Sequence, residues 1–267
     1  MLPTTAFDRY RHGESLVHAL DPRVKVLVTV LFIVSNVALA DGEWPAFGLA
    51  WLFLLLAAQL ARVTPGALAR RSVVALPFML AAVSVLFTLP GRTLWSAQLQ
   101  GWTLAISDAG LLRFVSILAR SWLSVQMAIL LTATTTFPDL MHALRHLRVP
   151  AVLVAILSFM YRYLFVLADE ANRLLRARAA RSARLASAEK RGGGGLLWRA
   201  RVAGAMVGQL FLRSFERSER VYHAMLARGY QGQLLTMNPH AMARRDWLVG
   251  AGAVGLLLCV QAVGLLG

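Results

Sequence analysis

Charged residues are scarce in this sequence of 267 residues: Asp, Glu, Lys and Arg together make up 15% of it, against 58% hydrophobic residues. A soluble domain carries about a quarter charged residues, so this composition is typical of a chain that has the lipid bilayer as its solvent. Cysteine is rarer still. Cys259 is the only one, which excludes an intrachain disulfide and gives no support for a thiol-based site.

The sequence patterns of several enzyme classes are also missing. No Gly-Lys-Ser/Thr follows the four glycines at 192–195, so the phosphate-binding loop of ATP-hydrolysing proteins is absent. There is no HExxH sequence, no Ser/His pair suited to nucleophilic catalysis and no pair of aspartates inside an apolar run. We therefore expect that the chain is not an enzyme and that it binds no cofactor or metal ion itself.

Positive charge, in contrast, is plentiful. There are 28 Lys and Arg residues and 13 Asp and Glu residues, which gives a formal net charge of +15. A basic balance can indicate nucleic-acid binding, but in so apolar a chain it is more typical of loops held at the anionic cytoplasmic surface of a membrane. We expect the bilayer, and no nucleic acid, as a partner.

Five apolar runs of 16 to 20 residues have about the length that crosses a hydrocarbon core. Because backbone groups in lipid must be hydrogen-bonded within their own segment, each run is predicted to be a helix. The predicted spans are residues 24–40, 46–61, 73–89, 114–133 and 248–267. The sequence thus predicts an all-α integral membrane protein with about five transmembrane helices.

A sixth apolar run, 149–168, allows two interpretations. As a further span it would place the most basic part of the chain outside, because residues 138–246 contain 18 Lys and Arg against 7 Asp and Glu, a net of +11. The positive-inside rule disfavours that orientation, and Arg162 in the middle of the run would be costly against lipid. We therefore favour five spans, with this run at the cytoplasmic surface, the N-terminus inside and the C-terminus outside.

The segment 169–181 is predicted to be a cytoplasmic helix. It consists of good helix formers, with acidic residues at its start and cations towards its end, which suits the helix dipole. Asp169 and Arg173 are predicted to form a favourable i,i+4 pair.

A second cytoplasmic helix is predicted over about 196–228. The glycines at 192–195 cost too much backbone entropy for a helix and predict a flexible linker before it. Apolar residues then recur at three- and four-residue steps, while the other face carries charges, including the i,i+4 pair Glu216 and Arg220. Gly229 is predicted to cap this helix. The helix could rest on lipid headgroups or dock a soluble partner, and its periodicity fits both.

Residues Asp21, Pro22, Arg23 and Lys25 stand at the start of the first span. We predict that Asp21 is the N-cap, that Pro22 occupies the first helical position and that the two cations lie at the inner membrane interface.

His142 and His146 are four residues apart and would share one face of a helix. They are an incomplete metal site, with only Asp139 as a possible third ligand. We interpret them as interfacial basic residues.

Two short motifs lie at the ends of the predicted cytoplasmic helices, Ala180-Arg181-Ser182 and Ala227-Arg228-Gly229. Together with the Asp-Pro-Arg-Val-Lys sequence before the first span, these motifs resemble the T component of energy-coupling factor (ECF) importers. The sequence Ala-Met-Leu-Ala-Arg-Gly-Tyr at 224–230 and the N-terminal layout are most similar to the cobalt-transport branch, CbiQ. The resemblance covers nearly the whole chain. In one departure from it, the first motif ends in Ser182 and not in glycine.

The resemblance implies a division of labour among subunits. A T component binds two ATP-binding cassette ATPase subunits through long coupling helices, and each motif arginine docks in a groove of one ATPase. The ATPases bind ATP and Mg, and the T component transmits their motion to a separate substrate-binding membrane subunit. By this resemblance the partners are a CbiM-like substrate-binding S component and a small CbiN-like accessory subunit, the substrate is the cobalt ion, and the location is the bacterial inner membrane.

The residues themselves allow a plainer interpretation as well. A guanidinium suits a carboxylate or a helix C-terminus on a partner, but without the family pattern Arg181 and Arg228 would be two surface arginines of little consequence. A self-sufficient secondary transporter is the alternative function, although it would need polar residues in several spans and often internal repeats. Nickel and vitamins are alternative substrates.

We divide the chain into residues 1–136 with four spans, residues 137–246 as the coupling region and residues 247–267 as the last span.

Overall fold

The computed structural model describes residues 13, 15–88, 90, 92–99, 102–181, 195–232 and 242–266. They belong to two compact units. The first contains the described part of residues 147–237, and the second contains the described parts of residues 8–146 and 238–267. The predicted functional boundaries at residues 136 and 246 stay a prediction, and each unit is treated by itself below.

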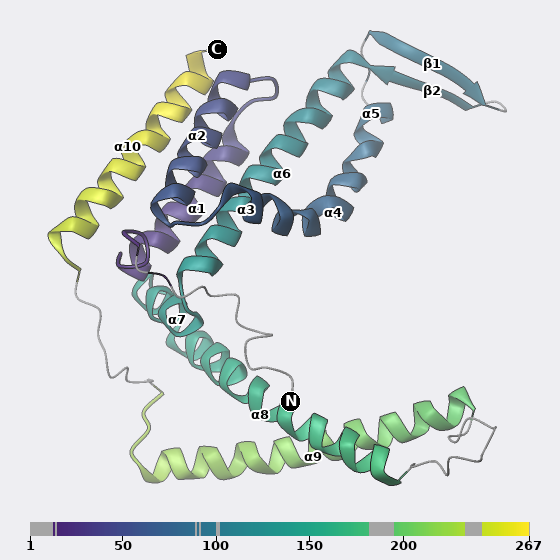
Figure 1. Cartoon of the computed structure of the whole chain (residues 1–267), viewed down its shortest axis with the longest axis vertical. Coiled ribbons are helices and arrows are strands. Elements are labelled where there is room, and N and C mark those ends of the chain that lie inside the picture. The colour runs from purple at the N-terminus through teal and green to yellow at the C-terminus, as the bar shows by residue number, and fades with distance from the viewer. Residues whose placement is uncertain are drawn as a thin grey trace. The chain divides into compact units, whose positions relative to one another are not determined.

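Four helices of the second unit form a bundle, in which α1 (Pro22–Ala38), α2 (Trp44–Leu60), α6 (Asp108–Thr134) and α10 (Arg244–Leu266) lie side by side (Figure 1). The core of the bundle is apolar, with Phe32 and Leu54 almost completely buried. Burying side chains of this size from several helices at once is what holds a bundle together.

Local sequence signals set where these helices begin and end. The side chain of Asp21 accepts a hydrogen bond from the backbone N–H of Arg23, with Pro22 next to it at the first position of α1. Ser107 caps α6 in the same way by accepting from the N–H of Gly110, at 3.0 Å. The predicted start of the first span is therefore confirmed.

The predicted span at 73–89 is not one regular helix. It consists of η2 (Val73–Ala75), α4 (Leu76–Ala81), η3 (Ala82–Ser84) and α5 (Val85–Thr88), and α3 (Pro65–Ser72) precedes it. Pro77 lacks the N–H that an α-helix would use to bond the preceding turn, which explains the 3₁₀ turn just before it. The chain also bends by 117° between α2 and the α3–η2 segment.

An antiparallel hairpin, absent from our prediction, joins α5 to α6. Strands β1 (Thr93–Leu99) and β2 (Trp102–Ser107) pair from Leu99 opposite Trp102 to Thr93 opposite Ser107, with an irregularity near Thr93. Apolar and polar residues alternate from Trp95 to Leu99 in β1, which is the period of a strand, whereas Leu104 to Ile106 in β2 are apolar without interruption. Our prediction assigns no element to this segment between the third and fourth spans.

The prediction of an all-α integral membrane protein is confirmed, with this hairpin as the one sheet in the described residues. By length and composition, three of the described helices can cross a membrane: α6, α10 and α8 (Ala151–Arg181). Helices α1 and α2 have 17 residues each, the lower end of the length range of spans. Because α8 qualifies on the same criteria, its predicted place at the cytoplasmic surface rests on the charge argument and stays a prediction.

The first unit consists of two long helices that run antiparallel and pack on each other, α8 with 31 residues and α9 (Leu196–Ala227) with 32 (Figure 1). Helix α8 joins the sixth apolar run and the predicted cytoplasmic helix into one continuous element, because nothing in the sequence between them breaks a helix. Of the predicted glycine linker, 192–194 lie outside the described residues, and Gly195 is the N-cap of α9.

Candidate partner-docking site

Arg181, the arginine of the first motif, is the last residue of α8. Both Ala180 and Arg181 are exposed, and Ser182 lies outside the described residues. The guanidinium of Arg181 forms no hydrogen bond or ion pair with any residue that the structure describes. Within the described part of the chain its donors are therefore unused.

The second motif forms the C-terminal cap of α9. Arg228 is the capping residue, and Gly229 follows in the left-handed conformation with a φ of +78°. The N–H of Gly229 donates to the carbonyl oxygen of Leu226 at 2.9 Å, and the N–H of Tyr230 donates to that of Met225 at 3.0 Å. These two bonds define the Schellman motif, which provides hydrogen bonds to carbonyl groups that have no partner within the last turn of the helix. The predicted cap at Gly229 is therefore confirmed.

This cap holds the second motif in a fixed conformation. Because Ala227 is the last helical residue, the direction in which the chain leaves α9 depends on the backbone of the two residues after it. Arg228 is exposed, and within the described ranges its guanidinium has no protein partner. The structure thus presents two exposed arginines, each at the end of a long helix and each without a partner among the described residues.

We expect Gly229→Ala to loosen the end of α9 by about 1 kcal/mol, since a Cβ is unfavourable at positive φ. Hydrogen exchange of the Tyr230 amide should become faster. The matched control is Gly208→Ala in the middle of α9, where an added Cβ meets nothing within 4 Å and helix propensity favours alanine by up to about 1 kcal/mol. Unchanged exchange at Tyr230 in Gly229→Ala would show that the cap does not depend on the glycine.

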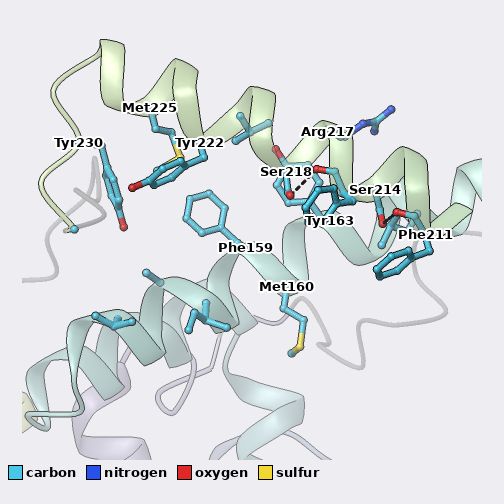
Figure 2. Close-up of a pocket in the computed structure, with 17 residues that line it drawn as sticks. Phe159, Met160, Tyr163, Phe211, Ser214, Arg217, Ser218, Tyr222, Met225 and Tyr230 are labelled. Atoms are coloured by element: carbon cyan, nitrogen blue, oxygen red, sulfur yellow. Dashed lines mark hydrogen bonds between the residues drawn. The ribbon is translucent and has the colours of Figure 1, made fainter.

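An apolar groove of about 760 Å³ runs between α8 and α9 (Figure 2). Its aromatic wall includes Phe159 and Tyr163 from α8 and Phe215 and Tyr222 from α9. Tyr230, just beyond the cap, lines the groove together with Met225, the residue whose carbonyl it bonds. The second motif therefore lies at one end of the groove. The same turn fixes the backbone positions of both Arg228 and Tyr230.

The apolar face of α9 was visible in the sequence, and the groove was not. The groove is lined by apolar residues of α9 that belong to the three- and four-residue pattern in the sequence, namely Phe211, Phe215, Val221, Tyr222 and Met225. Their partners on α8 were hidden inside the run 149–168, where apolar residues occupy every face and periodicity carries no information.

Glu170 provides the polar link between α8 and α9. It accepts from Arg213 of α9 at 2.5 Å and also pairs with Arg173 on its own helix. The predicted pair of Asp169 and Arg173 is therefore wrong, because Arg173 reaches the neighbouring carboxylate at i,i+3. The predicted pair within α9, Glu216 and Arg220, is confirmed at 3.9 Å.

The N-terminal end of α1 joins several helices of the bundle. The N–H of Asp21 donates to Asp246 of α10 at 3.2 Å, and the Lys25 ammonium donates to the carbonyl oxygens of His18 at 3.0 Å and Thr134 at 3.2 Å. Lys25 is 9% exposed, so it is a buried junction residue, and its predicted place at the inner membrane interface stays a prediction. Nothing in the sequence indicated that Asp246 of α10 lies next to Asp21 across the bundle.

Both histidines of the pair on α7 (Phe137–His146) have a use in the fold. Arg23 lies with a guanidinium nitrogen 3.2 Å from Nε2 of His142, and Nδ1 of His146 donates to the carbonyl oxygen of His142 at 3.0 Å. Arg23 thereby connects α1 to α7. Across the described residues, no three His, Cys, Asp or Glu side chains are grouped to hold a metal ion.

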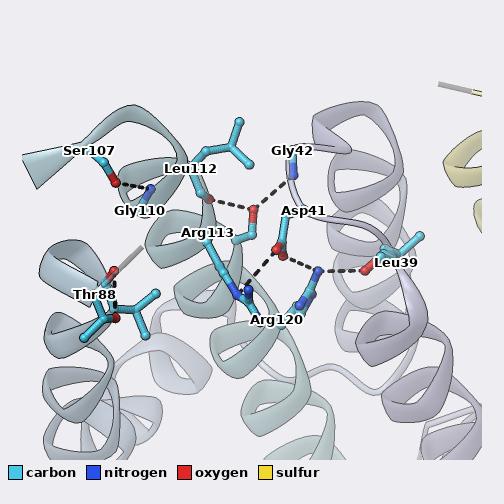
Figure 3. Close-up of polar contacts among 11 residues, drawn as sticks. Leu39, Asp41, Gly42, Thr88, Ser107, Gly110, Leu112, Arg113 and Arg120 are labelled. Atoms are coloured by element: carbon cyan, nitrogen blue, oxygen red, sulfur yellow. Dashed lines mark hydrogen bonds and ion pairs between the residues drawn. The ribbon is translucent and has the colours of Figure 1, made fainter. Parts of the chain in front are cut away.

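Arg120, whose partner the sequence did not reveal, is bound to Asp41 in the connection between α1 and α2 (Figure 3). Its guanidinium donates to the Asp41 carboxylate and to the carbonyl oxygen of Leu39, both at 2.7 Å, and lies 5.9 Å from the centre of the Phe47 ring. Arg113, at 3.7 Å, is a weaker second partner of Asp41. Asp41 was visible only as an acidic loop residue 79 positions away.

Comparison with known proteins identifies the family. Residues 13–238 match the model of the CbiQ family, described as "Cobalt transport protein". The chain belongs to the CbiQ family. It is 32% identical to the energy-coupling factor transporter transmembrane protein EcfT of Thermanaerovibrio acidaminovorans, over 96% of each chain. It is 28% identical to the protein of the same name from Lacticaseibacillus paracasei, over 95% of this chain and 97% of that one.

The region that matches the CbiQ model contains both arginine motifs, the groove and the start of α1, whereas α10 lies beyond it. The match to the EcfT proteins extends over almost the whole chain. The resemblance seen in the two motifs is therefore confirmed at the level of the family and of an ECF transporter membrane component.

Proposed function

We propose that this CbiQ-family chain is the non-catalytic T component of an ATP-driven ECF importer in the bacterial inner membrane. The observation that carries the proposal is the pair of exposed arginines, Arg181 and Arg228, which end two long helices and have no partner among the described residues. Surface arginines without partners are not needed for folding, and a guanidinium is well suited to bind a carboxylate or a helix end on another subunit.

The proposed partners follow from this role. Two ATP-binding cassette subunits each receive one motif arginine and bind ATP and Mg, so this chain needs no cofactor. A CbiM-like S component binds the substrate, with a CbiN-like accessory subunit. The motif residues Ala180, Ser182, Ala227 and Gly229 act by being small, which lets an ATPase surface approach the arginines closely. The N-terminus and the coupling helices α8 and α9 are cytoplasmic, in accordance with the charge distribution.

The groove between α8 and α9 supports a coupling role for these helices. Large side chains along it are exposed, among them Phe211 and Phe215, and an apolar surface of this kind marks an interaction site more often than a face left in water. We infer that it meets apolar partner surface or lipid, while the arginines meet the ATPases. Motion of the ATPases would then reach the membrane subunits through α8 and α9.

Cobalt is the proposed substrate, since the description of the family is that of a cobalt transport protein. The alternative, a secondary transporter, gains no support from the polar residues of the spans. Asn36 of α1 donates to Ser124 Oγ and to the carbonyl oxygen of Arg120, and Gln261 of α10 donates to Ser35 of α1. These side chains join helices, as polar residues in spans commonly do.

Transport in liposomes tests the proposal. We expect Co²⁺ uptake only when the chain is reconstituted with its ATPases and S component and ATP is supplied, and no uptake by the chain alone. An ATPase partner with its Walker lysine replaced is the matched control. Co²⁺ uptake measured with and without excess Ni²⁺ then tests whether the complex prefers Co²⁺ to Ni²⁺. ATP-independent uptake by the chain alone would establish the secondary transporter instead.

A further inference from the structure

Two adjoining cavities lie in the helix bundle at the level where α2 ends and α10 begins. The first, of about 660 Å³, is lined by Arg62, Arg245 and His18, and the second, of about 640 Å³, is lined by apolar side chains of α1, α2, α6 and α10. Gln59 and Leu60 line both, so the two cavities adjoin at these residues. Each has the volume of a small-molecule site, about 300–1,000 Å³.

The basic cavity has two arginines with unused donors. Arg62 and Arg245 are exposed, and neither guanidinium forms a hydrogen bond or ion pair with a described residue. No carboxylate is found among the described residues that line the cavity. Asp246, next to Arg245 in the sequence, is 6% exposed, and its two oxygens accept from the N–H groups of Asp21 and Ala243. Its charge is thus directed into the bundle.

Arg62 is also held in an unusual backbone conformation. It has a φ of +55°, at the end of α2, where its N–H donates to the carbonyl oxygen of Gln59 and the N–H of Val63 donates to that of Ala58. Glycine is the residue normally found at such a position. An arginine that is kept there at a cost of the order of 1 kcal/mol points to a use for its side chain.

The apolar cavity is lined by side chains that are exposed on the outside of the bundle. Leu56 and Leu60 of α2 and Leu256 of α10 line it and are each about half exposed. Gly252 contributes to the opening, because an added Cβ would meet nothing within 4 Å. Lys25 lies on the wall, with its ammonium bonded to two carbonyl oxygens and one donor left over. The cationic side chains thus lie at the helix ends, and the apolar protein surface extends from them along the helices.

We propose that this pair of cavities binds one anionic phospholipid, with its phosphate at Arg62 and Arg245 and an acyl chain in the apolar cavity. Charge complementarity selects the headgroup, since arginine forks bind phosphate oxygens well. The apolar cavity selects a lipid over free phosphate, because only a lipid covers that surface. The site uses neither motif arginine, so it holds independently of the proposed docking of ATPases.

Native mass spectrometry of the full chain in detergent tests the proposal, with dioleoyl phosphatidylglycerol and dioleoyl phosphatidylcholine as probes. We expect one phosphatidylglycerol to be retained in preference to phosphatidylcholine. Each arginine near an anionic lipid contributes about fivefold in affinity, so Arg62→Gln with Arg245→Gln should weaken binding roughly thirtyfold. The charge-matched control, Arg70→Gln with Arg244→Gln, should bind like the wild type.

Blocking the acyl chain is the second arm. Gly252→Leu should lower retention of phosphatidylglycerol, whereas Gly255→Leu, at a glycine that also has open space around it but does not line the cavity, should not. Ala253→Leu, in the same cavity, replaces Gly252→Leu if that variant cannot be purified. Inorganic phosphate should not displace the lipid. Equal binding of the two lipids, displacement by phosphate, or full binding by either the arginine or the cavity variant would overturn the proposal.

Discussion

Arg181→Ala combined with Arg228→Ala should abolish co-purification of the ATPase subunits while the chain itself remains folded in the membrane. Each arginine that fills a groove at an interface contributes about 2 kcal/mol or more, so the loss of both should weaken association roughly a thousandfold. Folding should not suffer, because both side chains are exposed and neither has a partner among the described residues.

The control for this variant removes the same charge from the same helices. Arg176 of α8 and Arg201 of α9 are exposed and outside the motifs, so Arg176→Ala with Arg201→Ala should retain the ATPases. Replacing the motif arginines by lysine should restore binding only in part, since an ammonium lacks the planar fork. If the double alanine variant retained the ATPases and transport, the docking role would be wrong and the two arginines would be ordinary surface residues.

Arg120→Met should lower the stability of the helix bundle by about 2 kcal/mol, because it leaves Asp41 and the Leu39 carbonyl without their main donor. The Arg120 side chain is 21% exposed and that of Asp41 29% exposed, so solvent screens the pair only partly. For a chain of this length the loss corresponds to a fall in melting temperature of about 5 °C, measurable by thermal unfolding in detergent.

Arg113→Met is the matched control for Arg120→Met. The side chain of Arg113 is 54% exposed and its Nε lies 3.7 Å from Asp41, so its loss should change stability by no more than about 0.5 kcal/mol. Asp41→Leu in the Arg120→Met background should recover part of the loss, since a matched apolar pair leaves no unpaired charge. Equal effects of the two arginine variants would show that Asp41 acts only as a surface charge.

Local signals in the sequence were sufficient where a structure depends on adjacent residues. Asp21 and Pro22 predicted the start of α1, and Gly229 predicted the cap of α9 at the second motif. The broken helix after α3 had its own local signal in Pro77, which we did not use. We predicted a span there from hydrophobicity alone, and hydrophobicity does not take into account that proline lacks a backbone N–H.

Contacts between distant parts of the chain were beyond sequence reasoning. Arg120 and Asp41 are 79 positions apart, and Asp21 and Asp246 are 225 apart, so neither pair has a spacing that could be recognised. The α8–α9 groove required knowledge of which face of a uniformly apolar run meets α9. The junction of α1 with its neighbours likewise depends on how the helices pack, so the burial of Lys25 could not be predicted from the residues next to it.

The central claim is that this chain couples ATPases to a substrate-binding membrane subunit, and affinity purification of the tagged chain from its native membrane tests it most directly. Mass spectrometry of the purified complex should find an ATP-binding cassette subunit and a small membrane protein that binds the substrate, and the identity of the latter should indicate a metal ion. If the chain is instead recovered alone, and transports in liposomes without ATP, the coupling account is contradicted and a self-sufficient transporter takes its place.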